Sequence, residues 1–247
     1  MVIQKLKDSI LSSVKKVLLK SGYTVLRGDI RKSIRENGSN AVPPPNLLKN
    51  ARIFADRYEV LKELPRGGTA VEVGVAYGDF TRPILEIMQP DIFIAIDNFS
   101  ISPQDEPWGR QLLKNSRSNH YDYYCGQFRD RIGEGRMFVR KGLSWEMIAA
   151  LPDNSVDYMY VDADHSYDSV FKEIQALKTK MKPNGIVQFN DYTYFNSDAM
   201  EAYGVPGAVH EFMLEENYEM LYLCLHPQGF YDVVLRKAGH AAGDLQR

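Results

Sequence analysis

The sequence predicts an α/β protein built on a doubly wound, mostly parallel sheet. Short apolar, β-branched runs alternate with segments that repeat apolar residues every three or four positions, along most of the 247 residues. A strand, a glycine turn and a helix follow one another over residues 69–88. Strands separated by helices pair in parallel, whereas strands joined by a short turn pair antiparallel.

Seven strands and six helices make up this pattern. The strands are expected at 69–73, 92–96, 137–140, 156–161, 185–189, 219–225 and 230–236, and the helices at 58–64, 80–88, 109–124, 145–151, 169–182 and 206–217. The last two strands, on either side of 226–229, form an antiparallel C-terminal hairpin. The polar, aromatic-rich stretch 98–135 is long for a crossover, so part of it is expected to form a lid.

The first 46 residues form a separate unit, followed by a main domain at 47–240 and a disordered tail at 241–247. Residues 1–36 contain nine Lys and Arg but three Asp and Glu, and apolar residues recur at helical spacing from Ile3 to Val17. We expect a basic amphipathic helix that packs on the main domain or on another subunit of a homo-oligomer; the alternative is peripheral membrane contact through residues 1–20. Residues 37–45, rich in Asn, Gly and Pro, are typical of a linker.

Composition narrows the class of protein. The net charge of −2 gives no electrostatic footprint for nucleic acid, so no nucleic-acid partner is expected. Cys125 and Cys224 lack metal-binding spacing and are typical of reduced thiols in a cytoplasmic protein. No apolar run reaches the roughly 18 residues that a membrane span needs.

The glycine turn and the acid that follows it indicate a nucleoside cofactor. Gly74 and Gly78 follow the strand 69–73, and Asp97 ends the next strand. A backbone without side chains can approach a ligand closely, and a strand-end acid can accept hydrogen bonds from ribose hydroxyls. Glu72 ends the first strand, where it would repel a pyrophosphate but suit an ammonium group. This favours S-adenosylmethionine over a nicotinamide dinucleotide, whose fold prefers a third glycine.

A second polar cluster follows the strands at 156–161 and 185–189. Asp162, Asn190 and Asp191 offer the hard oxygen ligands that suit Mg²⁺ or Mn²⁺, and His165 is placed to act as a general base. Simpler interpretations are open: Asp162 or Asp164 caps the next helix, Asn190 and Asp191 form a turn, or the carboxylates serve the cofactor or substrate without a metal.

The region from about Thr69 to Lys237 resembles the class I S-adenosylmethionine-dependent methyltransferases, which have a Rossmann-like sheet. The turn at 72–78, Asp97 and residues 142–145 match the positions that contact methionine, ribose and adenine in that family. The resemblance implies the following cofactor contacts: Glu72, Gly74, Tyr77, Gly78, Asp97, Asn98, Ser144, Trp145 and Asp162.

The segments 160–165 and 190–191 resemble those of metal-dependent O-methyltransferases. Asp162 and His165 match the Asp-x-x-His pattern of macrolide-sugar (macrocin and mycinamicin type) enzymes, in which the Asp binds Mg²⁺ and the His is the base. Catechol and caffeoyl-coenzyme A methyltransferases carry the neighbouring pair in Asp-Asn order, whereas this chain has Asn190 before Asp191.

These observations together predict an enzyme with catalytic residues His165 and Asp162 and metal ligands Asp162, Asn190 and Asp191. The predicted reaction is Mg²⁺-assisted O-methylation of a saccharide or glycosylated small molecule, and Tyr192 and Tyr194 are candidates for the acceptor pocket. Two alternatives stay open: methylation of another small-molecule hydroxyl, as in a catechol, and a nicotinamide-dependent oxidoreductase.

Overall fold

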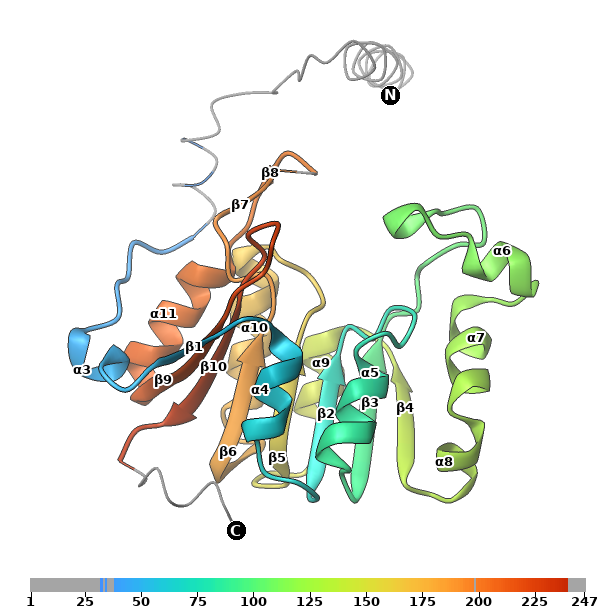
Figure 1. Cartoon of the computed structure of the whole chain (residues 1–247), viewed down its shortest axis with the longest axis horizontal. Coiled ribbons are helices and arrows are strands. Elements are labelled where there is room, and N and C mark those ends of the chain that lie inside the picture. Colours follow the sequence, from blue (N-terminus) through green and yellow to red (C-terminus); the bar gives the residue numbers. More distant parts are fainter. Residues whose placement is uncertain (1–31, 33, 35–37, 198, 240–247) are drawn as a thin grey trace.

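The computed structural model describes residues 32, 34, 38–197 and 199–239. An eight-stranded sheet runs through this part of the chain in the order β1-β9-β10-β6-β5-β2-β3-β4, with helices on both faces (Figure 1). Its strands are β1 (Arg52–Phe54), β2 (Thr69–Val73), β3 (Ile92–Asp97), β4 (Met137–Lys141), β5 (Val156–Val161), β6 (Met181–Phe189), β9 (Tyr218–Cys224) and β10 (Asp232–Lys237). A separate pair joins β7 (Phe195–Asn196) to β8 (Glu201–Ala202).

The predicted topology is confirmed. Strands β6, β5, β2, β3 and β4 pair in parallel, and β10 runs antiparallel to both β6 and β9. The structure adds one strand to the seven expected, because β1 pairs in parallel with β9 at the edge of the sheet. Three residues are too few to show a period in the sequence, and only the long-range pairing defines this strand.

The helices follow the predicted order, with corrections to their bounds and with additional short helices. They are α3 (Pro45–Leu48), α4 (Arg57–Glu63), α5 (Thr81–Pro83), the π-helix η1 (Ile84–Met88), the 3₁₀ turn η2 (Pro107–Gly109), α6 (Leu112–Ser116), α7 (His120–Gln127), α8 (Arg129–Gly133), α9 (Ser144–Ala149), α10 (Tyr167–Leu177) and α11 (Val205–Glu216). The helix expected at 169–182 ends at Leu177, because residues 181–182 already belong to β6. The single helix expected at 109–124 is also wrong. Arg117 has a left-handed φ of 55° that ends α6, and Asn119 then caps α7 by accepting from the Asp122 amide.

Alternate residues of each strand supply two apolar layers. Val71, Met159 and Val187 pack in the layer that includes residues of α9, α10 and α11. Their neighbours Ala70, Tyr158 and Ile186 pack in the other layer, with residues of α4, η1 and α7. Side chains alternate across a strand, so one strand serves both layers.

This alternation decides on which face the strand-end residues lie. Asp162 lies two residues after Tyr160, and Asn190 two residues after Gln188, in strands that pair Tyr160 with Gln188. Asp97 likewise follows Ala95, which pairs with Glu72. The polar strand ends therefore lie on the face that α4 and α5 cover.

The expected N-terminal helix at 1–20 and the tail at 241–247 lie outside the described residues. Residues 38–44 contain no helix, and they pack against α11. The Nδ1 atom of His210 is 2.8 Å from the carbonyl oxygen of Ala41, and a Cβ added to Gly207 would lie 2.7 Å from the Ser39 amide nitrogen.

Gly74 joins three strands at their carboxyl ends. Its φ is +85°, its amide donates to the Ile96 carbonyl (2.8 Å), and an added Cβ would lie 1.9 Å from the carbonyl oxygen of Asp162. Only glycine meets both demands, because other residues disfavour this φ and backbone cannot move aside cheaply.

Gly74→Ala is expected to lower the free energy of unfolding by more than about 2 kcal/mol, through a strained φ and a backbone clash. Gly133→Ala is the matched control, since Gly133 lies in α8 with open space around its Cβ position; it is expected to be neutral or stabilising by up to about 1 kcal/mol. Urea unfolding measures both, and equal stability of the two variants would contradict this account of Gly74.

Candidate active site

Backbone hydrogen bonds continue one residue past the strands and hold the site residues in register. The Asp162 amide donates to the Val73 carbonyl (2.8 Å), and the Asn190 amide donates to the Val161 carbonyl (3.0 Å). The ends of β2, β5 and β6 therefore carry their polar residues on a rigid ladder rather than on free loops.

Asp162, His165 and Asp191 form one cluster at this edge. The Nε2 atom of His165 is 3.1 Å from Oδ2 of Asp191 and 3.5 Å from Oδ1 of Asp162, and potential ligand atoms of the three lie within 4.8 Å of one another. The His165 ring stacks on Tyr203, with 4.5 Å between the ring centroids. The structure thus brings together the predicted base and two of the predicted metal ligands.

The electrostatics of the cluster favour a shared proton or a cation. Burial alone would lower the pKa of His165, but the hydrogen bond and charge of Asp162, with the charges of Asp191 and Asp164, raise this pKa above its ordinary value. Burial raises the pKa of Asp191 to about 6, against the opposing effect of His165. Two carboxylates so close together are costly to ionise without a positive charge between them.

Asn190 fits the predicted metal site. Its side chain is 7% exposed, and its Oδ1 atom is buried without a hydrogen-bond partner in the structure as described. A buried unpaired carbonyl oxygen carries a desolvation cost of roughly 1–3 kcal/mol, which a bound cation or donor would remove. Asp191 itself has a left-handed φ of 54°, a strained conformation of the kind found at functional sites.

The simpler capping interpretation is wrong for the two candidate acids. The residue that caps α10 is Ser166, whose side chain accepts from the Ser169 amide. Asp164 accepts from the Ser166 amide (2.7 Å) in the turn before the helix, while Asp162 stays free of the cap and points to His165.

Asp97 organises the glycine turn. One of its carboxylate oxygens accepts from the amides of Val75 (2.9 Å) and Ala76 (3.1 Å), and the other accepts from the Phe99 amide (2.6 Å). A carboxylate offers about four acceptor positions, so the second oxygen retains capacity for a ribose hydroxyl. Asn98 is exposed beside it, and its side chain accepts from the Ser100 amide.

Glu72 and Gly78 occupy tightly packed positions next to the glycine turn. Glu72 is 1% exposed and accepts from the Thr81 hydroxyl, and burial raises its pKa well above the ordinary value. An added Cβ on Gly78 would meet the Phe128 ring at 2.8 Å. Packing within the protein therefore explains both residue types, and their contact with the methionine end of the cofactor stays a prediction.

Tyr77 contacts side chains of the segment that follows β3. Trp108 packs edge-on against its ring at 6.0 Å, and the Arg110 guanidinium lies 5.3 Å from the ring and pairs with Asp79. Tyr77 Oη and His120 Nδ1 are both buried without a partner in the described part of the chain. Unpaired polar atoms beside the glycine turn fit a site that receives a polar ligand.

Ser144 begins α9 at the predicted adenine position. Its hydroxyl donates to Glu173 of α10, which is completely buried. Burial raises the pKa of Glu173 to about 7, against the opposing bond from Ser144. The neighbouring Trp145 ring faces Lys172, whose ammonium lies 4.9 Å from the ring centre.

Several residues that support the site from neighbouring elements could not be predicted from the sequence. Tyr203, the residue directly after β8, stacks on His165. Glu173 is an acid among the apolar residues of the buried face of α10. Tyr192, proposed for the acceptor pocket, bonds instead to His210 of α11, whereas Tyr194 is 45% exposed. No local pattern signals these long-range contacts.

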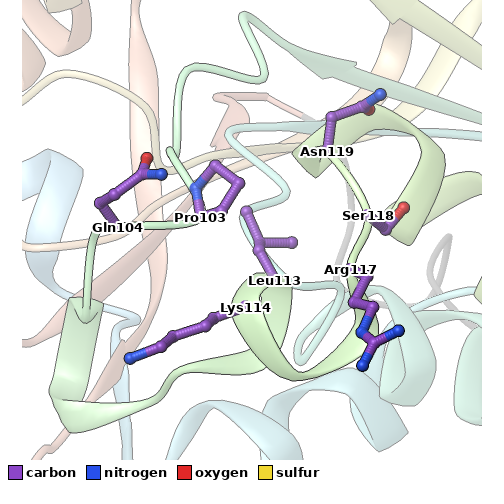
Figure 2. A pocket seen from close by; sticks show the side chains of 7 residues that line it. All are labelled: Pro103, Gln104, Leu113, Lys114, Arg117, Ser118 and Asn119. Carbon is purple, nitrogen blue, oxygen red and sulfur yellow. The ribbon is translucent and has the colours of Figure 1, made fainter.

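A cavity of about 550 Å³ lies within the segment that follows β3 (Figure 2). Its lining residues are Pro103, Gln104, Leu113, Lys114, Arg117, Ser118 and Asn119. Leu113 points to its centre, while the Lys114 and Arg117 side chains diverge. None of the predicted cofactor or metal residues lines this cavity.

Comparison with known proteins agrees with the geometry. Residues 71–192, just under half of the chain, match a family of methyltransferase domains. No curated protein sequence matches the chain significantly. Among solved structures, a SAM-dependent methyltransferase from Aquifex aeolicus matches with a TM-score of 0.50 at 17% identity, over 85% of this chain and 98% of its own.

Two further solved structures match this chain over part of their length. A spermidine synthase in complex with the transition-state analogue AdoDATO has a TM-score of 0.50 at 14% identity, over 78% of this chain and 60% of its own. The pyocyanin biosynthetic protein PhzM has a TM-score of 0.47 at 14% identity, over 70% of this chain. This chain spans 51% of PhzM, about half.

The fold and the family match together support one class of protein, the class I S-adenosylmethionine-dependent methyltransferases. Within it, the matched residues 71–192 run from the glycine strand to the acids that follow β6, so the match contains every predicted catalytic, cofactor and metal residue, while Tyr194 lies two residues beyond it. In the described part of the chain, no helix is both long and apolar enough to cross a membrane.

Asp97→Ala is expected to weaken binding of S-adenosylmethionine by about 1–3 kcal/mol, because three loop amides and the ribose lose their acceptor. Isothermal titration calorimetry measures the affinity, with Asp105→Ala as control, whose carboxylate accepts from Ser102 in an exposed loop. Unchanged affinity in Asp97→Ala would remove this residue from the cofactor site.

Proposed function

We propose that this protein is a metal-assisted O-methyltransferase that methylates a hydroxyl group of a saccharide or glycosylated small molecule. The observation that supports it most is the cluster of Asp162, His165 and Asp191 at the carboxyl ends of β5 and β6. The cluster lies next to the strand β2 that carries the glycine turn, so a hydroxyl there would lie beside the expected cofactor.

The chemistry needs a base and a way to acidify the acceptor. S-adenosylmethionine, when bound, supplies the methyl group at its sulfonium. An alcohol must lose its proton as the methyl carbon arrives, and the imidazole of His165 can take that proton at Nε2. Asp162 and Asp191 flank the same nitrogen, so they stabilise the imidazolium that forms.

The same acids, with Asn190, would hold a divalent cation. Mg²⁺ or Mn²⁺, when bound, would lower the pKa of an acceptor hydroxyl and orient it. Carboxylate and amide carbonyl oxygens are the ligands that suit such hard cations. With a cation held by these oxygens, the imidazole of His165 would remain the group that takes the proton of the acceptor hydroxyl.

The sugar acceptor is supported by the Asp-x-x-His spacing of Asp162 and His165, and a catechol-like hydroxyl is the alternative acceptor for the same cluster. Many solved structures share this fold, so the fold does not choose between them. The methyltransferase family match argues against a nicotinamide-dependent oxidoreductase.

Chelation is expected to abolish methyl transfer, because the acceptor hydroxyl then keeps its high pKa. The measurement uses radiolabelled S-adenosylmethionine with a panel of nucleotide-linked hexoses, alkyl glycosides and catechol, with mass spectrometry to locate the new O-methyl group. EDTA should stop the reaction while adenosylhomocysteine still binds, and Mg²⁺ should restore it. Full activity in excess EDTA would rule out the metal, and methylation of catechol alone would rule out the sugar.

His165→Ala is expected to lower turnover by roughly 10²–10⁴, the usual contribution of a positioned general base, with little change in cofactor affinity. His226→Ala is the control, since this histidine lies in the β9–β10 turn and its ring faces the Gln228 amide. Near-normal turnover of His165→Ala in initial-rate assays would place the base elsewhere.

A further inference from the structure

We propose that Arg57 is a positioning residue of this site, which acts through Tyr160 to fix the orientation of the Asp162 carboxylate. The inference rests on the proposed function for its effect on metal binding. The hydrogen bonds that carry it do not depend on that function. Arg57 belongs to α4, outside the matched domain residues and before the glycine strand.

A directed chain of hydrogen bonds leads from Arg57 to the site. The Nη1 atom of Arg57 donates to Tyr160 Oη (2.6 Å), and Tyr160 Oη donates to Asp162 Oδ2 (3.4 Å). A phenol carries one hydrogen. Because its oxygen accepts from the guanidinium, that hydrogen is available for the carboxylate.

The two carboxylate oxygens of Asp162 therefore have different partners. Oδ2 faces Tyr160 on the α4 side of the sheet, while Oδ1 faces His165 at 3.5 Å. A carboxylate free to rotate would offer either oxygen to the site, whereas the bond from Tyr160 leaves Oδ1 directed at His165. One defined oxygen is what a single ligand bond to a metal requires.

The surroundings make this chain rigid. Tyr160 is fully buried in the sheet, and Arg57 lies over the Phe80 ring at 4.6 Å. The Asp56 side chain caps α4 by accepting from the Tyr58 and Glu59 amides, which fixes the first turn, where Arg57 lies. The 2.6 Å bond from the Arg57 guanidinium to Tyr160 has the short length of a charge-assisted hydrogen bond, which fixes the position of the phenol beside Asp162.

Charge complements the geometry. Burial alone would lower the pKa of Arg57, but Tyr160, Asp232 and Asp162 raise it, so the guanidinium stays charged. Asp232 is also buried, and burial raises its pKa to about 7, against the effect of Arg57. Arg57 is thus the fixed positive charge on the α4 side of the acids, opposite His165.

A purely structural role is the competing explanation: Arg57 would only neutralise Asp232, which Gln188 also binds (2.6 Å). The two explanations differ in what Tyr160→Phe does. This change keeps the buried ring and the Arg57–Asp232 attraction but removes the link to Asp162. A structural role predicts no effect on the site, and a positioning role predicts a clear one.

Mn²⁺ titration of the full-length protein, followed by electron paramagnetic resonance, tests the proposal without an acceptor. Tyr160→Phe and Arg57→Gln are each expected to weaken Mn²⁺ binding about tenfold or more, as residues that orient metal ligands do. The double variant should be little weaker than Arg57→Gln alone, since both changes break one chain. Adenosylhomocysteine affinity should not change.

Arg52→Gln is the matched control. Arg52 lies on the neighbouring strand β1 and pairs with Glu63 at the surface, so its loss should leave Mn²⁺ affinity unchanged. Wild-type Mn²⁺ affinity in Tyr160→Phe would overturn the proposal. Thermal unfolding identifies any Arg57→Gln protein that fails to fold, and Tyr160→Phe then decides.

If the wild-type protein binds no Mn²⁺, the metal part of the proposed function fails, and the Arg57 inference is decided by crystal structures of the wild type and Tyr160→Phe. Rotation of the Asp162 carboxylate in Tyr160→Phe would support the positioning role. An unchanged carboxylate would overturn it.

Discussion

The close contact between β2 and β5 at their carboxyl ends is the constraint on which the rest of the site depends. The Gly74 Cα lies against the Asp162 backbone, and the Asp162 amide bonds to Val73. This contact places the glycine turn and the acid–histidine cluster on adjacent strands, about 5 Å apart in the direction of pairing. It also explains why a residue of the turn must lack a side chain, independent of any ligand.

Several acids near this edge are buried or half-buried. Burial raises the pKa of Asp191 to about 6 and the pKa values of Glu173 and Asp232 to about 7. A folded-state pKa above the unfolded value means that the folded protein binds more protons in between, so the free energy of unfolding falls as pH rises from about 4 to 7. The free energy of unfolding therefore falls over the pH range in which these acids ionise. Such a loss is typical of functional sites, where buried charged groups reduce stability.

Local patterns predicted most of the fold and part of the site. Apolar runs and helical spacing identified seven of the eight sheet strands, because those elements are long enough to show their period. Strand ends predicted that Asp162, His165 and Asp191 lie together, since parallel strands bring their carboxyl ends together, while the cofactor role of Asp97 stays a prediction. The break at Arg117 was missed because no proline or glycine marks it. Arg57 and Tyr203 were missed because their contacts join residues far apart in the sequence.

The central claim is that the ends of β5 and β6 form one metal and proton-transfer site beside the cofactor. A crystal structure with adenosylhomocysteine and Mn²⁺, with anomalous scattering to locate the metal, tests it most directly. The account predicts an anomalous peak bonded to Asp162 and Asp191, with the nucleoside ribose at Asp97. A peak at another place in the protein, or a ribose far from Asp97, would contradict it.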